Sequence, residues 1–253
     1  MSILHCTTAA MAAGHTIGAM RRILLSLPLL LLAGCGSPHP ATTTAPPSSH
    51  PSASASPSAQ ASAAPDVDRI DVVSSGVGSY QLVAVPVAVL HNAAVRTAAT
   101  AVIVHFIPTR GGQPLTPLAS SAVILYPGQS LVVTANCTDT CNNADGATVS
   151  VAVGAWTAIP GGPITTSGPV YACGGGCGGH GYGDVTATVQ GTNLAQGTRV
   201  DLFAGCMDGS GRIVGGGERQ LTWPQPGGSL SLDVPVILSA QPSSCQVAAS
   251  AAA

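Results

Sequence analysis

The stretch SAVILYPGQSLVVTA, residues 121–135, decides the fold, because the chain repeats its plan further on as ERQLTWPQPGGSLSLDVPV, residues 218–236. Each copy has an apolar segment, a turn that holds an aromatic residue and proline, and a second apolar segment that begins with Ser-Leu. Apolar runs on either side of such a turn predict a β-hairpin. We therefore expect two copies of one β-rich unit.

The segments around both stretches support this duplication. Short apolar runs occur at Gln81–Leu90, Ala99–Ile107 and Ala147–Val153 in the first copy, and at Asp184–Gln190, Thr198–Cys206 and Cys245–Ser250 in the second. Such spacing predicts an all-β fold of two tandem immunoglobulin-like β-sandwich repeats, residues 66–155 and 184–253. Residues 156–183, which hold many turn formers and a glycine-rich cysteine loop, are expected to connect them. A single larger sandwich is the alternative.

For one expected strand, residues 199–204, the sequence does not determine which face points into the core. Residues 199–204 alternate between two sets, with Val200, Leu202 and Ala204 in one and Arg199, Asp201 and Phe203 in the other. Alternation of this kind is typical of a strand with two different faces. The pattern does not show which set points inward.

The composition argues against one class of partner. Only 7% of the residues are charged, all eight basic residues are arginine, and the formal net charge is −2. Nucleic-acid binding needs a clustered basic face, so we expect no nucleic-acid partner. The single glutamate, Glu218, has no partner carboxylate close to it in the sequence, although Asp201, Asp208 or Asp233 could approach it in the folded chain.

The N-terminal segment predicts export. Two arginines precede the apolar run Ile23–Leu32, and small residues follow it. This order is typical of a signal peptide. The run is too short to cross a hydrocarbon core as a helix, which needs about 20 residues.

The end of the run, Leu32-Ala33-Gly34-Cys35, resembles the lipobox of bacterial lipoproteins. That resemblance implies transfer of diacylglycerol to the Cys35 sulfur, cleavage before Cys35, and acylation of the new amino terminus, for example with palmitate. Residues 1–35 would then be a lipoprotein signal sequence, and the mature protein would be held at the outer face of the cell membrane. Two or more acyl chains anchor firmly, since each buried methylene contributes ~0.8 kcal/mol. An ordinary cleaved signal with a coincidental cysteine is the alternative.

Two further features concern the N-terminal region. A start at Met20 would give the compact signal MRRILLSLPLLLLAGC, so we expect translation to start at Met20, with Met1 as the alternative. Residues 36–65 consist largely of Pro, Ser, Thr and Ala, and they have too few apolar side chains to offset their ordering entropy. We expect a disordered linker that spaces the folded part from the membrane.

Parts of both repeats resemble a known family. The segments VDLFAGCMDGSGRIVGGG, residues 200–217, and LYPGQSLVV, residues 125–133, resemble the FxLYD-type and related immunoglobulin-like domains of bacterial surface lipoproteins. The likeness covers roughly half of the folded region, and the aromatic-Leu-Tyr-Asp signature itself is not present. It implies a binding or spacer module without catalytic residues, and no functional residue is carried over.

The cysteines predict disulfides. After Cys35 the exported region has six, an even number, which allows fifteen connectivities. Cys206 ends one expected strand and Cys245 begins the last strand of the same repeat, so we expect them to pair. Cys137–Cys141 and Cys173–Cys177 are expected as local pairs. Cross-pairing between these two CxxxC units is the main alternative.

The glycine-rich stretch CGGGCGGHGYG, residues 173–183, also suggests a metal site. Cys173, Cys177 and His180 are ligand types that suit zinc or copper. A closed zinc site needs four ligands, and thiols outside the cell tend to oxidise. We therefore keep these three residues as weak metal-ligand candidates and expect no metal or other cofactor.

No motif predicts catalysis. The chain has no Gly-x-Ser-x-Gly elbow, no HExxH and no phosphate loop. The Asp208–Arg212 segment lacks the fifth and twelfth ligands of a calcium loop and predicts an exposed turn.

We therefore expect a lipid-anchored protein that is not an enzyme and has a binding or structural role at the cell envelope. Its partner would be an envelope protein or the cell wall. A lipoprotein that binds a small molecule or a metal is the second hypothesis, and an enzyme whose site forms only in three dimensions is the third. An apolar groove between the repeats would favour the second hypothesis, and a flat polar surface would favour the first.

Overall fold

The computed structural model describes residues 67–138, 140–174 and 181–252 of the protein. All regular structure within these ranges is β-strand, and they hold no helix that is long and apolar enough to cross a membrane. The predicted all-β fold class is confirmed. The predicted signal sequence and linker lie outside the described residues.

The first repeat folds into two antiparallel sheets. One has the order β1-β2-β7, with β8 also paired to β2, and in the other β3 pairs with β4, β5 and β6 along one side and with β9 and β10 along the other. The strands are β1 (Ile70–Tyr80), β2 (Val83–Asn92), β3 (Ala98–Arg110), β4 (Gln113–Pro114), β5 (Leu118–Ala119), β6 (Val123–Leu125), β7 (Ser130–Thr134), β8 (Cys137–Thr138), β9 (Gly146–Ala152) and β10 (Ala155–Thr157).

The second repeat is one bent sheet with the order β11-β12-β15-β14-β13-β16. Its strands are β11 (Thr165–Cys173), β12 (Gly181–Gln190), β13 (Arg199–Met207), β14 (Ile213–Thr222), β15 (Ser229–Leu238) and β16 (Ser244–Ala251). Because β14 and β15 pair only at Gly215–Leu238 and Gly216–Ile237, the sheet opens into two halves that enclose a core.

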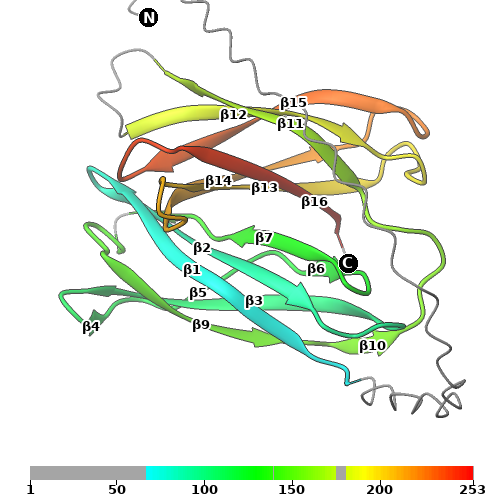
Figure 1. Ribbon diagram of the computed structural model, residues 1–253, viewed down its shortest axis with the longest axis horizontal. Helices are drawn as coiled ribbons and strands as arrows, with labels where there is room; N and C mark the ends of the chain where they lie inside the picture. Colours follow the sequence, from blue (N-terminus) through cyan, green and yellow to red (C-terminus); the bar gives the residue numbers. More distant parts are fainter. Residues whose placement is uncertain (1–66, 139, 175–180, 253) are drawn as a thin grey trace, which may run out of the picture. The chain divides into compact units, whose positions relative to one another are not determined.

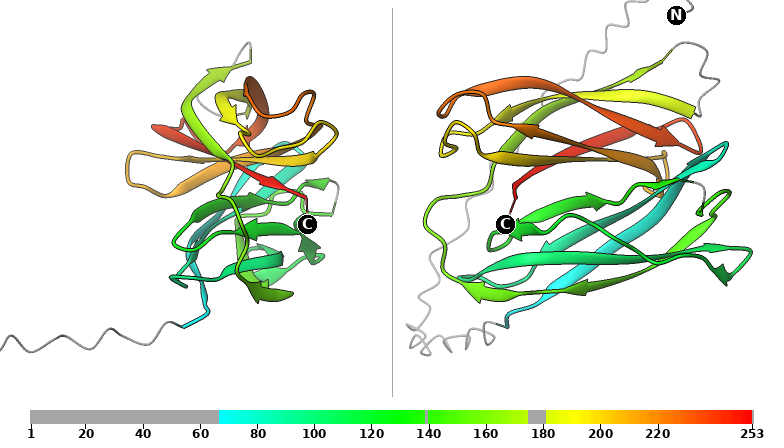
Figure 2. Two further views of the ribbon diagram at one scale, coloured as in Figure 1. Left: turned by 90° about the vertical axis from the view of Figure 1, so that its right-hand side faces the viewer. Right: turned by 180° about the vertical axis from the view of Figure 1, so that it is seen from behind.

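The two repeats share one topology. In each, the first two strands and the strand after the proline-containing turn form one layer, β1-β2-β7 and β11-β12-β15, while β3 and β13 lie in the other layer beside the last strand. This division of strands is consistent with an immunoglobulin-like sandwich. Figure 1 shows the four layers stacked in the order β3 sheet, β1-β2-β7, β14-β13-β16 and β11-β12-β15, and the reverse view in Figure 2 agrees.

The hairpin expected in residues 121–135 does not form. β6 pairs with β3 and β7 pairs with β2, so the Pro127-Gly128 turn carries the chain from one sheet to the other. The amide of Gly128 donates to the carbonyls of Asn92 and Ala94, and this ties the turn to the neighbouring β2–β3 connection. The matching WPQPGG turn of the second repeat likewise joins strands that pair only at their other ends.

The expected connector, residues 156–183, is shorter than predicted. Trp156 and Thr157 still belong to β10 of the first repeat, and Thr165–Cys173 form β11, which pairs with β12 of the second. β11 is hard to predict from the sequence because it contains Gly168 and Pro169, which are rare inside strands. An edge strand tolerates both residues where its register shifts, as it does between Ser167 and Val170.

The apolar interior joins the repeats. One core cluster fills the first sandwich and also includes Phe203 and Ile213 from the second repeat. From Val200 onward both faces of β13 are buried: Val200, Leu202 and Ala204 lie in the core of the second repeat, whereas Phe203 packs against the first. Both sets therefore face an interior except at Arg199, which is exposed at the start of the strand, because β13 lies in a layer covered on each side.

Glycines allow the two middle layers to pack closely. A Cβ atom on Gly205 of β13 would lie 2.6 Å from Cγ2 of Val132 in β7, and one on Gly76 of β1 would lie 2.8 Å from Cβ of Ile213 in β14. A Cβ on Gly78 would overlap the Cα atom of Gly215 and the carbonyl oxygen of Ile237. The two repeats therefore meet backbone to backbone, and they do so only because these positions lack side chains.

Replacement of Gly78 by alanine should weaken this junction. Overpacking of a tight interior costs typically 1–3 kcal/mol, so we expect Gly78→Ala to lower the free energy of unfolding by about 2 kcal/mol and the melting temperature by about 4–8 °C. The matched control is Gly209→Ala, since a Cβ atom there has no neighbour within 4 Å. Equal melting temperatures for the two variants in thermal denaturation would contradict the close packing.

Candidate functional site

Several predicted site residues lie outside the described part of the chain. These are the lipidation residue Cys35 and the metal-ligand candidates Cys177 and His180. Cys173, the third metal-ligand candidate, ends β11 and is disulfide-bonded. The Cys173–Cys177 pairing stays a prediction. Among the residues that the structure describes, no group of three or more His, Cys, Asp or Glu side chains is placed to hold a metal ion.

The structure pairs Cys206 with Cys245, as the repeat argument predicts. The two residues lie directly opposite each other on β13 and β16, with Cα atoms 4.0 Å apart. The bond closes a loop with a sequence separation of 39, for which chain entropy gives a stabilisation of ~4 kcal/mol. It ties the last strand of the second repeat to the layer that contacts the first.

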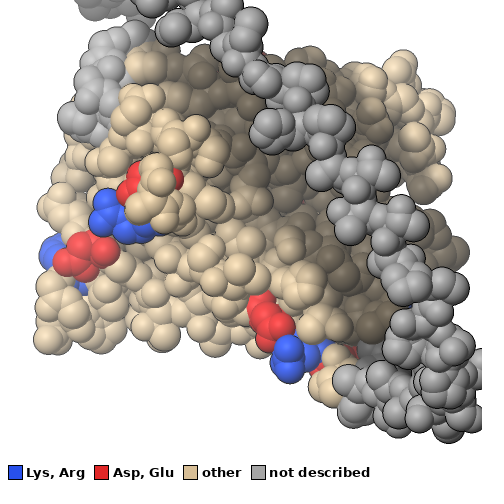
Figure 3. All heavy atoms as spheres, in the orientation of Figure 1, with Lys and Arg blue, Asp and Glu red and all other residues tan. Residues whose placement is uncertain are grey.

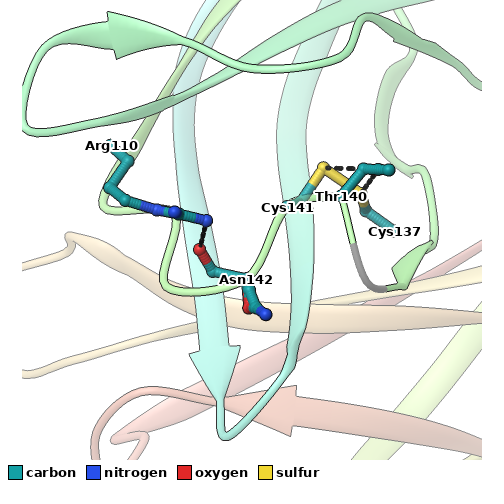
Figure 4. The surroundings of a disulfide bond; sticks show 5 residues. All are labelled: Arg110, Cys137, Thr140, Cys141 and Asn142. Carbon is teal, nitrogen blue, oxygen red and sulfur yellow. Dashed lines mark hydrogen bonds between the residues drawn. A yellow bond between two sulfur atoms is a disulfide. The ribbon is translucent and has the colours of Figure 1, made fainter.

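Cys137 and Cys141 also form a disulfide, with Cα atoms 5.7 Å apart. Figure 4 shows Thr140 beside both sulfur atoms, 3.4 Å from that of Cys137, and Arg110 reaching the backbone carbonyl of Asn142. Both cysteines are buried in a small cluster with Ala84 and Ala144. The bond therefore closes one end of the first repeat.

The Asp208 loop is a self-contained turn. Its carboxylate accepts hydrogen bonds from the amide and hydroxyl of Ser210 at 2.9 and 2.6 Å, and from the amide and guanidinium of Arg212. These donors, with the hydroxyl of Ser210 foremost, lower the pKa of Asp208 to about 2. Because its own loop supplies these donors, the carboxylate has a structural role in this exposed turn, in agreement with the sequence interpretation.

The strongest site in the structure was not predicted and centres on Glu218. Phe203 and Glu218 are register partners on β13 and β14, and Asp201 lies two residues along on the same face, towards the first repeat. Asn136 Nδ2 donates to Glu218 Oε1 at 2.9 Å, and the Thr134 hydroxyl lies 3.5 Å from Oε2. Glu218 thus connects the two repeats through polar contacts.

The surroundings of Glu218 disfavour its charge. Burial raises the pKa of its carboxyl above the ordinary 4.5, and the negative charge of Asp201 raises it further, whereas the bond from Thr134 acts in the opposite direction. Asp201 is only 4% exposed and accepts a hydrogen bond from Gln220. The two ion pairs within the described residues, Arg69–Asp71 and Arg212–Asp208, are elsewhere. A buried and a half-buried carboxylate therefore lie close together, and neither forms an ion pair.

Two pockets meet at Glu218 and Asn136. One, of about 400 Å³, is mainly polar, and its lining includes Arg199, Asp201 and Arg219. The other, of about 300 Å³, has mainly apolar walls from both repeats, including Val85 and Tyr182. A third hollow of about 220 Å³ lies near Tyr126 and Gly191 and is lined by no charged residue. A perturbed carboxyl at the boundary of two pockets is typical of a functional site.

The sequence held one signal for this site. Glu218 is the single glutamate, and Asp201, Asp208 and Asp233 were its possible partners. Of these three, Asp201 is the carboxylate whose charge acts on Glu218. Asp208 accepts hydrogen bonds within its own turn, and Asp233 accepts one from Thr186 at 2.6 Å. Charge is sparse elsewhere, since the face in Figure 3 shows only small groups of charged side chains with both signs present.

Comparison with known proteins supplies no relative. No protein-family model, no curated protein and no solved structure matches this chain. The resemblances to lipoprotein signals and to FxLYD-type domains therefore remain predictions.

The raised pKa of Glu218 predicts a pH dependence of stability. The folded state binds this proton more tightly than the unfolded chain, so the contribution is fully present below pH 4.5 and is lost as the pH rises through the folded-state pKa. Urea denaturation from pH 4 to 8 should show Glu218→Gln, which keeps an oxygen for Asn136, gaining stability relative to wild type as the pH rises.

Asp208 acts in a separate pH range. Its lowered pKa gives stability that is lost as the pH falls from 3.8 towards about 2. Asp208 therefore does not contribute to a change of the free energy of unfolding with pH above pH 4.5. The control for the Glu218 experiment is Asp233→Asn, which changes an exposed carboxylate. Parallel stability profiles for wild type and Glu218→Gln between pH 4 and 8 would show that the surroundings of Glu218 do not disfavour its charge.

Proposed function

We propose that this protein is an exported lipoprotein, anchored through Cys35 at the outer face of the cell membrane, with a non-catalytic binding role at the envelope. The support for anchoring is the N-terminal sequence, in which two arginines, an apolar run and Leu32-Ala33-Gly34-Cys35 follow in order. Residues 36–65 would reach ~30 Å as a flexible coil and ~90 Å when extended, enough to hold the folded part away from the lipid surface.

The observation that carries a binding role is the pair of pockets at the junction of the repeats. Their charged and polar groups include the three carboxylates of Asp184, Asp201 and Glu218, two arginines and the amides of Asn136 and Gln220, with Ser121 at the margin. Neither His91 nor His105 lines them, so the described residues place no histidine base beside that serine. Such a site can recognise a ligand through hydrogen bonds and charge.

A small-molecule ligand is favoured over a purely structural role by one specific feature. The pocket of about 300 Å³ is lined by residues of both repeats and has mainly apolar walls. A groove of this kind between the repeats is what the hypothesis of a small-molecule-binding lipoprotein expects. We propose that the folded part holds such a ligand near the membrane surface or presents it to another envelope component.

Replacement of Cys35 tests the anchoring. In bacterial cells that express the full chain, wild type should incorporate labelled palmitate and sediment with membranes, whereas Cys35→Ala should carry no label and should be released or remain unprocessed. Cys6→Ala is the matched control, since Cys6 lies before the predicted cleavage site. Unchanged membrane retention of Cys35→Ala would overturn the anchoring proposal.

A further inference from the structure

The pocket of about 300 Å³ combines apolar surface with acidic side chains. Val85 of β2, Pro235, Val236 and Ile237 of β15, and the ring of Tyr182 at the start of β12 supply the apolar surface. Tyr80 of the first repeat contacts the Tyr182 ring edge to face, with ring centroids 5.4 Å apart, and this holds the ring in place. Tyr182 is 49% exposed, so it forms the rim of the pocket.

All charged residues that line this pocket are acids. They are Glu218 and Asp184, and Asp201 lies behind Glu218 and adds to the negative potential. Asn136 supplies an amide that already donates to Glu218 Oε1. Thr134 Oγ1 approaches only Oε2, at 3.5 Å, so the carboxylate keeps capacity for a stronger donor from a ligand.

We propose that the pocket binds a small organic cation, an ammonium group on an apolar body, with the ammonium at Glu218 and the body against Tyr182 and Pro235. The inference rests on the proposed binding role and names its ligand class. Charge complementarity excludes an anion, because the lining carries only negative charge. A metal ion fits less well, because most of the lining is apolar, whereas a hard cation such as Ca²⁺ takes about six to eight oxygen ligands.

The acidic and apolar side chains of the lining suit such a ligand. An ammonium N–H donated to a carboxylate gives a charge-assisted hydrogen bond, which is stronger where water is partly excluded. A tyrosine ring adds cation–π attraction and apolar contact. A bound cation would also neutralise a carboxylate that burial and Asp201 make costly to ionise, and it would supply the ion-pair partner that Glu218 lacks among the described residues.

Matched probes test the inference on the full chain purified in non-ionic detergent. Benzylammonium and benzyl alcohol have nearly the same shape and differ in charge, and titration calorimetry measures both. We expect wild type to bind benzylammonium about tenfold more tightly than benzyl alcohol, the effect of one charge-assisted hydrogen bond. Glu218→Gln, which retains the acceptor for Asn136, should lose most of this preference, with Asp184 leaving a small remainder.

Two further variants separate charge recognition from general effects. Asp233→Asn removes a carboxylate that does not line the pocket and should leave the tenfold preference unchanged. Tyr182→Leu should weaken the binding of both probes. Equal binding of the two probes to wild type would overturn the cation inference and leave a neutral ligand for the proposed binding role. Binding of neither probe would overturn the inference at this pocket, while anchoring through Cys35 is judged by its own experiment.

Discussion

The close approach of two glycine-containing layers holds this structure together. Gly76 and Gly78 in β1 and Gly205 in β13 remove the side chains that would otherwise separate the repeats, so β2 and β7 pack directly onto β13 and β14. A strand covered on both faces must be apolar on both faces, which explains why β2 is an almost unbroken apolar run. The contact joins the two small sandwiches of the described residues into one compact unit.

The same junction creates the candidate site. Where the packed layers end, the face of β13 and β14 that carries Phe203 into the core also carries Asp201 and Glu218 towards its margin. Their carboxylates are partly removed from water but meet amides and hydroxyls rather than ion-pair partners. Two carboxylates that are partly removed from water and have no ion-pair partner lower the free energy of unfolding. Such a cost is typical of a site that binds a ligand. Cys206–Cys245 fixes the neighbouring strand and so limits how far this margin can move.

Local sequence patterns predicted the strands and their duplication, and the repeat logic predicted which strands share Cys206 and Cys245. They could not predict which sheet a strand joins, since Pro127-Gly128 has the same composition in a hairpin turn as in a crossing between sheets. β11 was missed because Gly168 and Pro169 are rare inside strands and are tolerated only at an edge. The site was missed because Glu218 and Asn136 are far apart in sequence, and only the packing of the two repeats brings them together.

The central claim is that the two repeats form one cooperative unit through their shared core. Differential scanning calorimetry of the full chain with its disulfides intact tests it most directly, because a two-state transition has equal calorimetric and van't Hoff enthalpies. The structure predicts a single transition with a ratio near one and an enthalpy of about 0.7 kcal/mol for each folded residue. Two resolved transitions, each with about half of that enthalpy, would show that the repeats unfold independently and would contradict the account.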